Sequence, residues 1–94
     1  MGPRKKVLVG SVLCSVLALQ ALTVTGQHSG DFLSRHEAGD WGDGLNLQEY
    51  EDNERAIGEG LAVASAYLLS NGETLWILSD AGGIATRLLL GSEF

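Results

Sequence analysis

The sequence lacks most of the features that would tie it to a known chemistry. It has a single cysteine, Cys14, so no disulfide can form within the chain, which suits a reducing compartment. It contains no glycine-rich phosphate loop, no serine-nucleophile elbow and no paired cysteine set. We therefore predict a protein that is not an enzyme and that needs no cofactor.

Positive charge is scarce after residue 27. Residues 28–94 hold twelve acids against three arginines, a net charge of −9, whereas the first 27 residues hold three bases and no acid. Without a basic face the chain cannot replace the counterions of double-stranded nucleic acid, so direct binding to nucleic acid is not expected. Such an acidic domain can meet a basic protein surface, including one that normally binds nucleic acid, although surface acids also serve solubility alone.

An uncharged apolar run covers residues 7–24, directly after three basic residues. Its length allows a signal sequence or a membrane anchor, which would make the protein secreted or membrane-anchored. It lacks a small-x-small cleavage site, however, and it also fits a strand at residues 6–9 followed by a helix over residues 16–24 that Ser15 caps. Because Cys14 lies within this run, we expect a buried thiol and not a nucleophile.

Two further helices are predicted before the strands. Ser29 is placed to cap a helix that Gly39 ends, and Asn46 with Glu49 forms a capping box that opens the next one. This last helix is expected to run to about residue 57. Its apolar residues are expected to share one stripe and its acids to face water; the apolar residues are Leu47, Tyr50 and Ile57.

Three strands are predicted in the last third of the chain. They cover residues 61–69, 74–79 and 84–90, and Asn71-Gly72 is a strong signal for a hairpin between the first two. Trp76 lies in the middle of the second strand and is expected in the core.

These elements predict an α+β fold within a single domain, residues 1–94. An N-terminal short strand and two to three helices would pack on one face of a three- to four-stranded antiparallel β-meander. Residues 1–44 would supply the strand and helical part with the polar loop, and residues 45–94 the last helix and the meander.

Residues 35–43 combine a histidine, three carboxylates, an aromatic side chain and two glycines in nine positions, and they include His36, Asp40 and Asp43. Imidazole and carboxylate groups bind metals, and three such ligands can hold catalytic zinc, so a metal-dependent enzyme or regulator is one alternative. The other alternative is structural, with His36 bonded to the backbone and Asp40 capping a turn. Trp41, flanked by acids, fits either a core residue or an aromatic interface anchor.

Two segments, Leu33-Ser34-Arg35-His36 and Gly39-Asp40-Trp41-Gly42, resemble the Leu-x-Arg-His-x-x-Gly-Asp-Trp-Gly motif of a bacterial protein family. This family consists of small uncharacterised proteins, common on plasmids and often labelled plasmid-related protein or type I restriction endonuclease subunit M. The similarity covers nearly the whole chain. It departs at residues 79–83, where the family has Thr-Glu-Ala-Asp-Arg, so the chain resembles a divergent member. The restriction label itself finds no support, because the sequence holds no cofactor-binding α/β domain.

The resemblance implies a cytoplasmic protein without a membrane anchor. Together with the charge, it leads us to expect a small acidic protein-interaction or regulatory protein of a bacterium or mobile element, with its contact surface around residues 37–59. The candidate binding residues are His36, Asp40, Trp41, Asp43, Glu51 and Asp52. A more specific alternative is an inhibitor of a bacterial defence nuclease, whose acids would occupy a nucleic-acid-binding surface. A homodimer through the sheet edge or the first helix is a further alternative.

Overall fold

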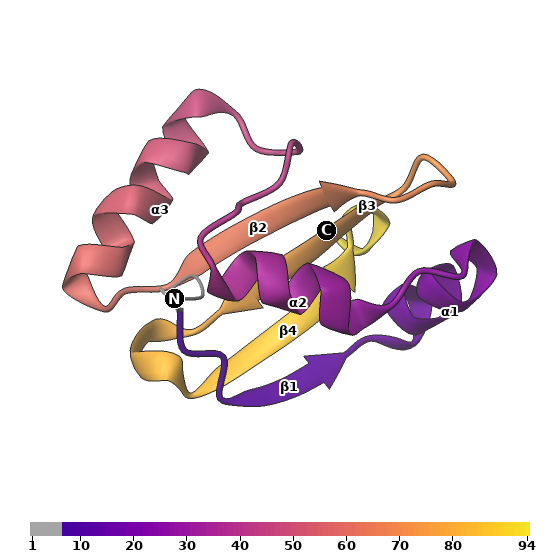
Figure 1. The fold of residues 1–94 in the computed structure, drawn as a ribbon, viewed down its shortest axis with the longest axis horizontal. Coiled ribbons are helices and arrows are strands. Elements are labelled where there is room, and N and C mark those ends of the chain that lie inside the picture. The colour runs from indigo at the N-terminus through magenta and orange to yellow at the C-terminus, as the bar shows by residue number, and fades with distance from the viewer. Residues whose placement is uncertain (1–6) are drawn as a thin grey trace, which may run out of the picture.

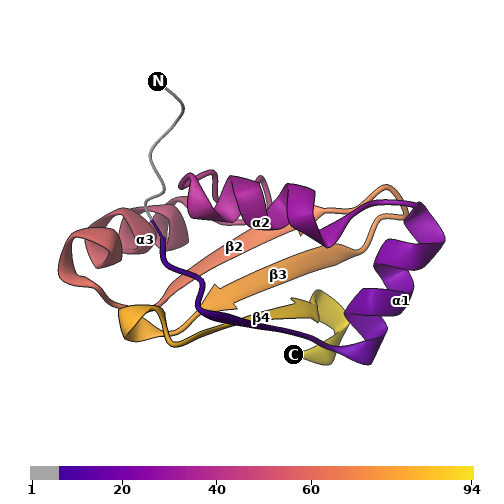
Figure 2. The ribbon, with the colours of Figure 1, turned by 60° about the horizontal axis from the view of Figure 1, so that its bottom comes forward.

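Three helices lie on one side of a four-stranded sheet in the computed structural model, which describes residues 7–94 (Figures 1 and 2). In chain order the elements are β1 (Ser11–Cys14), α1 (Val16–Thr25), α2 (Ser29–Glu37), α3 (Leu47–Glu59), β2 (Val63–Leu68), β3 (Thr74–Ser79) and β4 (Ala85–Leu90). Short 3-10 turns follow β3 and β4, at Ala81–Gly83 and Gly91–Glu93. The predicted α+β class is confirmed.

The sheet is mixed, with the strand order β1-β4-β3-β2. β2, β3 and β4 form the predicted antiparallel meander. β1, however, pairs with β4 in the parallel sense, so an entirely antiparallel sheet was wrong. The reason lies in the connection: all three helices separate β1 from the meander, so no hairpin imposes an antiparallel pairing.

The predicted N-terminal strand was placed too early. Of residues 6–9 the structure describes 7–9, which are irregular, while β1 begins at Ser11. Gly10 lies between them with φ of 59°, and a side chain there would collide with the backbone of Gly83 and Ile84. Because the chain bends at Gly10, only the residues after it align with β4.

The predicted helix signals are largely confirmed. Ser15 accepts a hydrogen bond from the N–H of Ala18 at 3.0 Å and caps α1, which ends at Gly26 in the left-handed conformation. Asn46 and Glu49 form the full capping box of α3. The predicted cap of α2 was wrong, because Ser29 is its first helical residue and follows the capping position.

The core lies between the helices and the sheet. Side chains of β3 point alternately into this core and to the opposite face of the sheet. Leu75 and Ile77 point to the helices and are fully buried, whereas Trp76 and Leu78 point to the opposite face. The expected core position of Trp76 was therefore wrong. The principal cluster joins α1 and α2 to the sheet; its members are Ala18, Ala21, Leu22, Phe32, Tyr67, Leu69, Leu75, Ile77, Leu88 and Leu90.

The long apolar run near the N-terminus is divided between β1 and the ten-residue helix α1. Within residues 7–94 no helix combines the length and the apolarity that crossing a membrane requires.

Candidate functional site

The segment from Arg35 to Gly42 forms the end of α2 and the turn that follows. The N–H groups of Gly39 and Asp40 donate to the carbonyls of His36 and Arg35 at 3.1 and 2.8 Å, the two bonds of a Schellman motif. Gly39 adopts φ of 82°, which only glycine tolerates easily. This turn places Arg35 and Asp40 beside each other.

Arg35 and Asp40 form a two-pronged ion pair. Arg35 Nε and Nη2 donate to the two carboxylate oxygens of Asp40 at 2.7 and 3.3 Å, and the guanidinium lies over the Tyr67 ring at 4.6 Å. The hydrogen bond from Arg35 holds the pKa of Asp40 below its usual range, and the N–H of Gly42 also donates to this carboxylate. Tyr67 completes the arrangement by donating from its hydroxyl to the Asp40 carbonyl at 2.6 Å.

His36 is fully buried in the centre of a polar chain. Its Nδ1 lies 2.5 Å from Ser65 Oγ and its Nε2 lies 2.8 Å from Ser79 Oγ, which in turn lies 2.6 Å from Thr86 Oγ1. Thr86 donates its hydroxyl proton to the carbonyl of Val9 at 2.7 Å.

The direction of this chain fixes the state of the imidazole. Because the Thr86 proton is used at Val9, Ser79 must donate to Thr86 and therefore accepts from His36 Nε2–H. Nδ1 is then the acceptor of the Ser65 hydroxyl proton. Burial lowers the pKa of His36 to about 4, so the ring is neutral at pH 7. The Ser79 proton points away from His36, so Ser79 is not arranged as a nucleophile with His36 as its base. Ser65 does donate to His36 Nδ1, but both residues are fully buried, out of reach of a substrate.

Trp41 is almost completely buried, at 1% exposure. Its Nε1–H donates to Glu54 of α3 at 2.7 Å, and its ring meets the His36 ring edge-on with centroids 5.9 Å apart. It also packs with Ala56 and Val63, so it joins α3 to the sheet. Of the two alternatives for Trp41, the core residue is the one that the structure supports.

Trp41 and the loop after it also close the edge of β2. The Ala66 N–H donates to the Trp41 carbonyl and the Gly44 N–H donates to the Ala66 carbonyl, each at 3.0 Å. Any side chain at Gly42 would strike the same Ala66 carbonyl. Two residues earlier in β2, the side-chain amide of Asn53 bonds to both the carbonyl and the N–H of Ala64, at 2.6 and 3.0 Å. This edge is therefore unavailable for a dimer.

His36, Asp40 and Asp43 do not form a metal site. Both ring nitrogens of His36 are occupied by serines, Asp40 is paired with Arg35, and Asp43 is exposed. Within residues 7–94 there is no cluster of three or more metal-ligating side chains.

Cys14 is exposed on β1, so the expected buried thiol was wrong. β1 is an edge strand, and this leaves even its apolar residues open to solvent. Partial burial and then the charge of Glu93 raise the pKa of Cys14, which opposes formation of a thiolate.

Among the candidate binding residues, Glu51 and Asp52 are exposed on α3. The same helix exposes Leu47 and Tyr50, at 72% and 48%, contrary to the expected inward stripe. The inner face belongs instead to Asn53, which bonds to β2, and to Ala56. We call Leu47, Tyr50, Glu51 and Asp52 the α3 surface.

A groove of about 410 Å³ runs between α3 and the strands β2 and β3. Three carboxylates border it, from Glu49, Asp52 and Asp80, while its remaining lining includes Ala64 and Leu78. An apolar floor with carboxylates at its border suits a lysine or arginine side chain, whose aliphatic stem packs while its charged end stays near the acids. This groove could not be predicted from the sequence, because Asp80 lies more than twenty residues from α3.

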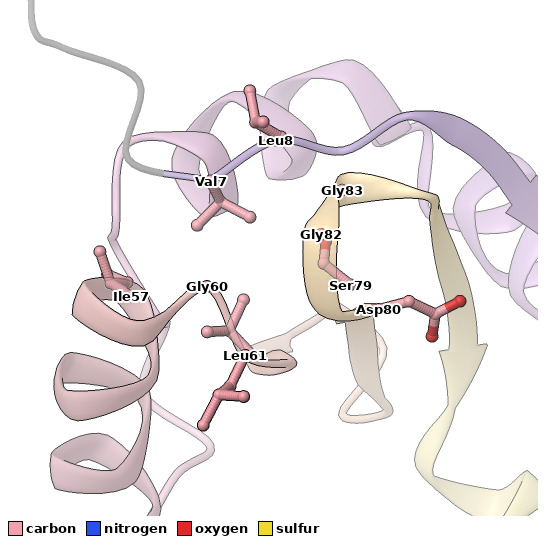
Figure 3. A pocket seen from close by; sticks show the side chains of 10 residues that line it. Val7, Leu8, Ile57, Gly60, Leu61, Ser79, Asp80, Gly82 and Gly83 are labelled. Carbon is pink, nitrogen blue, oxygen red and sulfur yellow. The ribbon is translucent and has the colours of Figure 1, made fainter.

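A smaller hollow of about 210 Å³ lies between the end of α3, the segment Val7-Leu8 and the turn at Gly82-Gly83 (Figure 3). Val7 points into the hollow, whereas the Asp80 carboxylate points away from it. The lining is mostly backbone and apolar side chains, so we assign it no chemistry.

Comparisons with protein-family models, curated proteins and solved structures returned no match to this chain.

Proposed function

We propose that this chain is a small acidic protein that acts by binding a basic protein surface and not by catalysis. The observation that carries the proposal is the α3 surface, where Leu47 and Tyr50 are exposed beside the carboxylate of Glu51. Asp52 lies on the flank of the helix that borders the groove. Exposed aromatic residues bordered by polar groups are typical binding hot spots, and carboxylates select a positively charged partner.

The groove beside α3 supports the same partner chemistry. Two of its acids, Glu49 and Asp52, belong to α3 itself, so the groove borders this helix. Asp52 belongs to both the surface and the groove, although Arg55 already lies 3.5 Å from it. Because that pair is exposed, it is weak, and an incoming guanidinium can replace Arg55.

The setting in which this binding occurs rests on the resemblance. It favours a cytoplasmic protein of a bacterium or mobile element, and it makes an inhibitor of a defence nuclease the more specific form of the proposal. Competition by duplex DNA for the captured partner would support that form, because the acids would then occupy a nucleic-acid-binding surface.

A triple substitution, Tyr50→Ala with Glu51→Lys and Asp52→Lys, should reduce partner binding at least about tenfold, since it removes an anchor and reverses two charges. The measurement is affinity capture from lysate of the source cells, quantified by mass spectrometry, with circular dichroism to verify the fold. Capture by the unchanged protein should also weaken at high salt.

The matched control carries the same charge change away from α3. Asp31→Lys with Glu73→Lys reverses two exposed acids on α2 and on the β2–β3 hairpin. It should capture the partner as the unchanged protein does. Equal losses for the two variants would show a general charge effect and would reject the α3 surface as the contact.

A further inference from the structure

The sheet face opposite the helices carries apolar side chains from all four strands. By register Trp76 lies beside Leu89, and Arg87 lies between Leu78 and Leu13. We call the following set the open sheet face: Leu13, Leu68, Trp76, Leu78, Arg87 and Leu89. Figure 2 shows the helices α2 and α3 on the other side of the sheet.

Exposure on this face is high on the two edge strands, whereas Trp76, Leu78 and Leu89 on the central strands are partly buried. Leu13 and Leu68 are each 58% exposed, and Phe94, whose ring lies 5.7 Å from the Trp76 ring, is 71% exposed. A contiguous apolar patch of this kind on a small protein marks an interaction site.

The charge on the open sheet face nearly cancels, in contrast to the chain as a whole. Arg87 is its one cation, and Asp80 lies 3.9 Å away. The chain carries a net charge of −6, and two of its acids, Glu49 and Asp52 of α3, border a groove that also reaches Leu78 of the open sheet face. Two copies that meet at these six residues therefore bring no uncompensated charge of the set itself into the contact.

The area is sufficient for self-association. Strands about 4.8 Å apart with residues rising about 3.3 Å give a four-stranded face a footprint of roughly 400 Å² before side-chain relief is added. With that relief and Phe94, two copies would bury about 1,000 Å² in total, the size at which a specific interface is expected.

We propose that a second copy of this chain covers the open sheet face, and that the two sheets stack into a sandwich with the helices outside. A second copy presents a sheet of identical twist, and two such sheets pack about 10 Å apart with their strands nearly aligned. Each Arg87 keeps its own Asp80, so neither copy has to supply an acid to the other. This dimer does not rest on the proposed function: it leaves Leu47, Tyr50 and Glu51 free, but it covers Leu78, which also lines the groove beside α3.

The test is the mass of the full chain in solution, measured by sedimentation equilibrium between about 1 and 100 µM. The expected mass at the upper concentration is twice the 9.9 kDa of one chain. Leu13→Glu with Leu68→Glu should raise the dissociation constant of the dimer at least about 30-fold, because it brings four carboxylates into the apolar interface. A chain that stays monomeric at 100 µM overturns the proposal, and so does a double variant that still dimerises.

Leu19→Glu is the matched control. Leu19 is 57% exposed, but it lies on α1, away from the open sheet face. This variant should dimerise as the unchanged chain does, and an equal loss would place the interface elsewhere.

A second measurement needs no charged variant. Trp41→Phe leaves Trp76 as the only tryptophan, and dissociation on dilution should shift its fluorescence to the red as solvent reaches the ring. A fall in mass on dilution without that shift would show a dimer with a different interface. A mass that grows beyond two chains would show open-ended assembly. Either result contradicts the closed dimer.

Discussion

Replacing Trp41 with alanine should destabilise the protein by about 3–5 kcal/mol, the usual effect of truncating a buried tryptophan. The side chain is 1% exposed, donates to Glu54 and packs edge-on against His36, so its loss leaves a cavity between α3 and the sheet. Native domains are stable by only about 5–15 kcal/mol, so a large part of the chain would unfold.

Urea titration followed by far-ultraviolet circular dichroism measures this effect. Tyr50→Ala is the control, because it removes an aromatic side chain of the same helix-and-loop region that is 48% exposed. Its free energy of unfolding should change by less than about 1 kcal/mol. An unfolding midpoint of Trp41→Ala equal to that of the unchanged protein would show that Trp41 is not a core residue.

Lowering the pH from 7.5 to 5 should remove about 2 kcal/mol of stability through His36 alone. Burial lowers the pKa of this histidine to about 4 in the folded protein, from its ordinary value of 6.5. Between these values the unfolded chain binds a proton that the folded chain cannot bind. The contribution is therefore fully present above about pH 6.5 and decreases as the pH falls towards 4.

The experiment compares urea unfolding at pH 7.5 and 5 for the unchanged protein, His36→Gln and His28→Gln. The His36 variant should be less stable at pH 7.5, because Ser65 and Ser79 lose a matched partner, but it should lose about 2 kcal/mol less on acidification. His28 is exposed, so its variant should follow the unchanged protein. An equal pH dependence of the free energy of unfolding in all three proteins would show that folding does not lower the pKa of His36.

Local signals in the sequence predicted local structure well. The capping serine of α1, the capping box of α3 and the Asn71-Gly72 hairpin act within a few residues, and each lies where it was predicted. The orientation of α3 could not be predicted in this way. Its apolar residues suggested a stripe through Leu47 and Tyr50, but the bonds from Asn53 to the edge of β2 turn the helix so that both are exposed.

In the candidate site, too, nearby residues could be predicted from the sequence but contacts between distant residues could not. The sequence singled out His36 and Trp41, yet their structural roles depend on Ser65, Ser79 and Glu54, which no spacing rule connects to them. A polar cluster that looked like chemistry is thus a network of satisfied hydrogen bonds. Within the described residues, no buried polar side-chain atom lacks a partner.

Residues 35–42 build the fold, whereas the proposed contact with a partner lies on the α3 surface. The most direct test compares two variants in one capture experiment, at a temperature where both are folded: Trp41→Phe, and Tyr50→Ala with Glu51→Lys and Asp52→Lys. We predict that Trp41→Phe retains the partner despite its lower stability, whereas the α3 variant loses it with its stability nearly unchanged. Loss of the partner by Trp41→Phe together with full capture by the α3 variant would contradict the account.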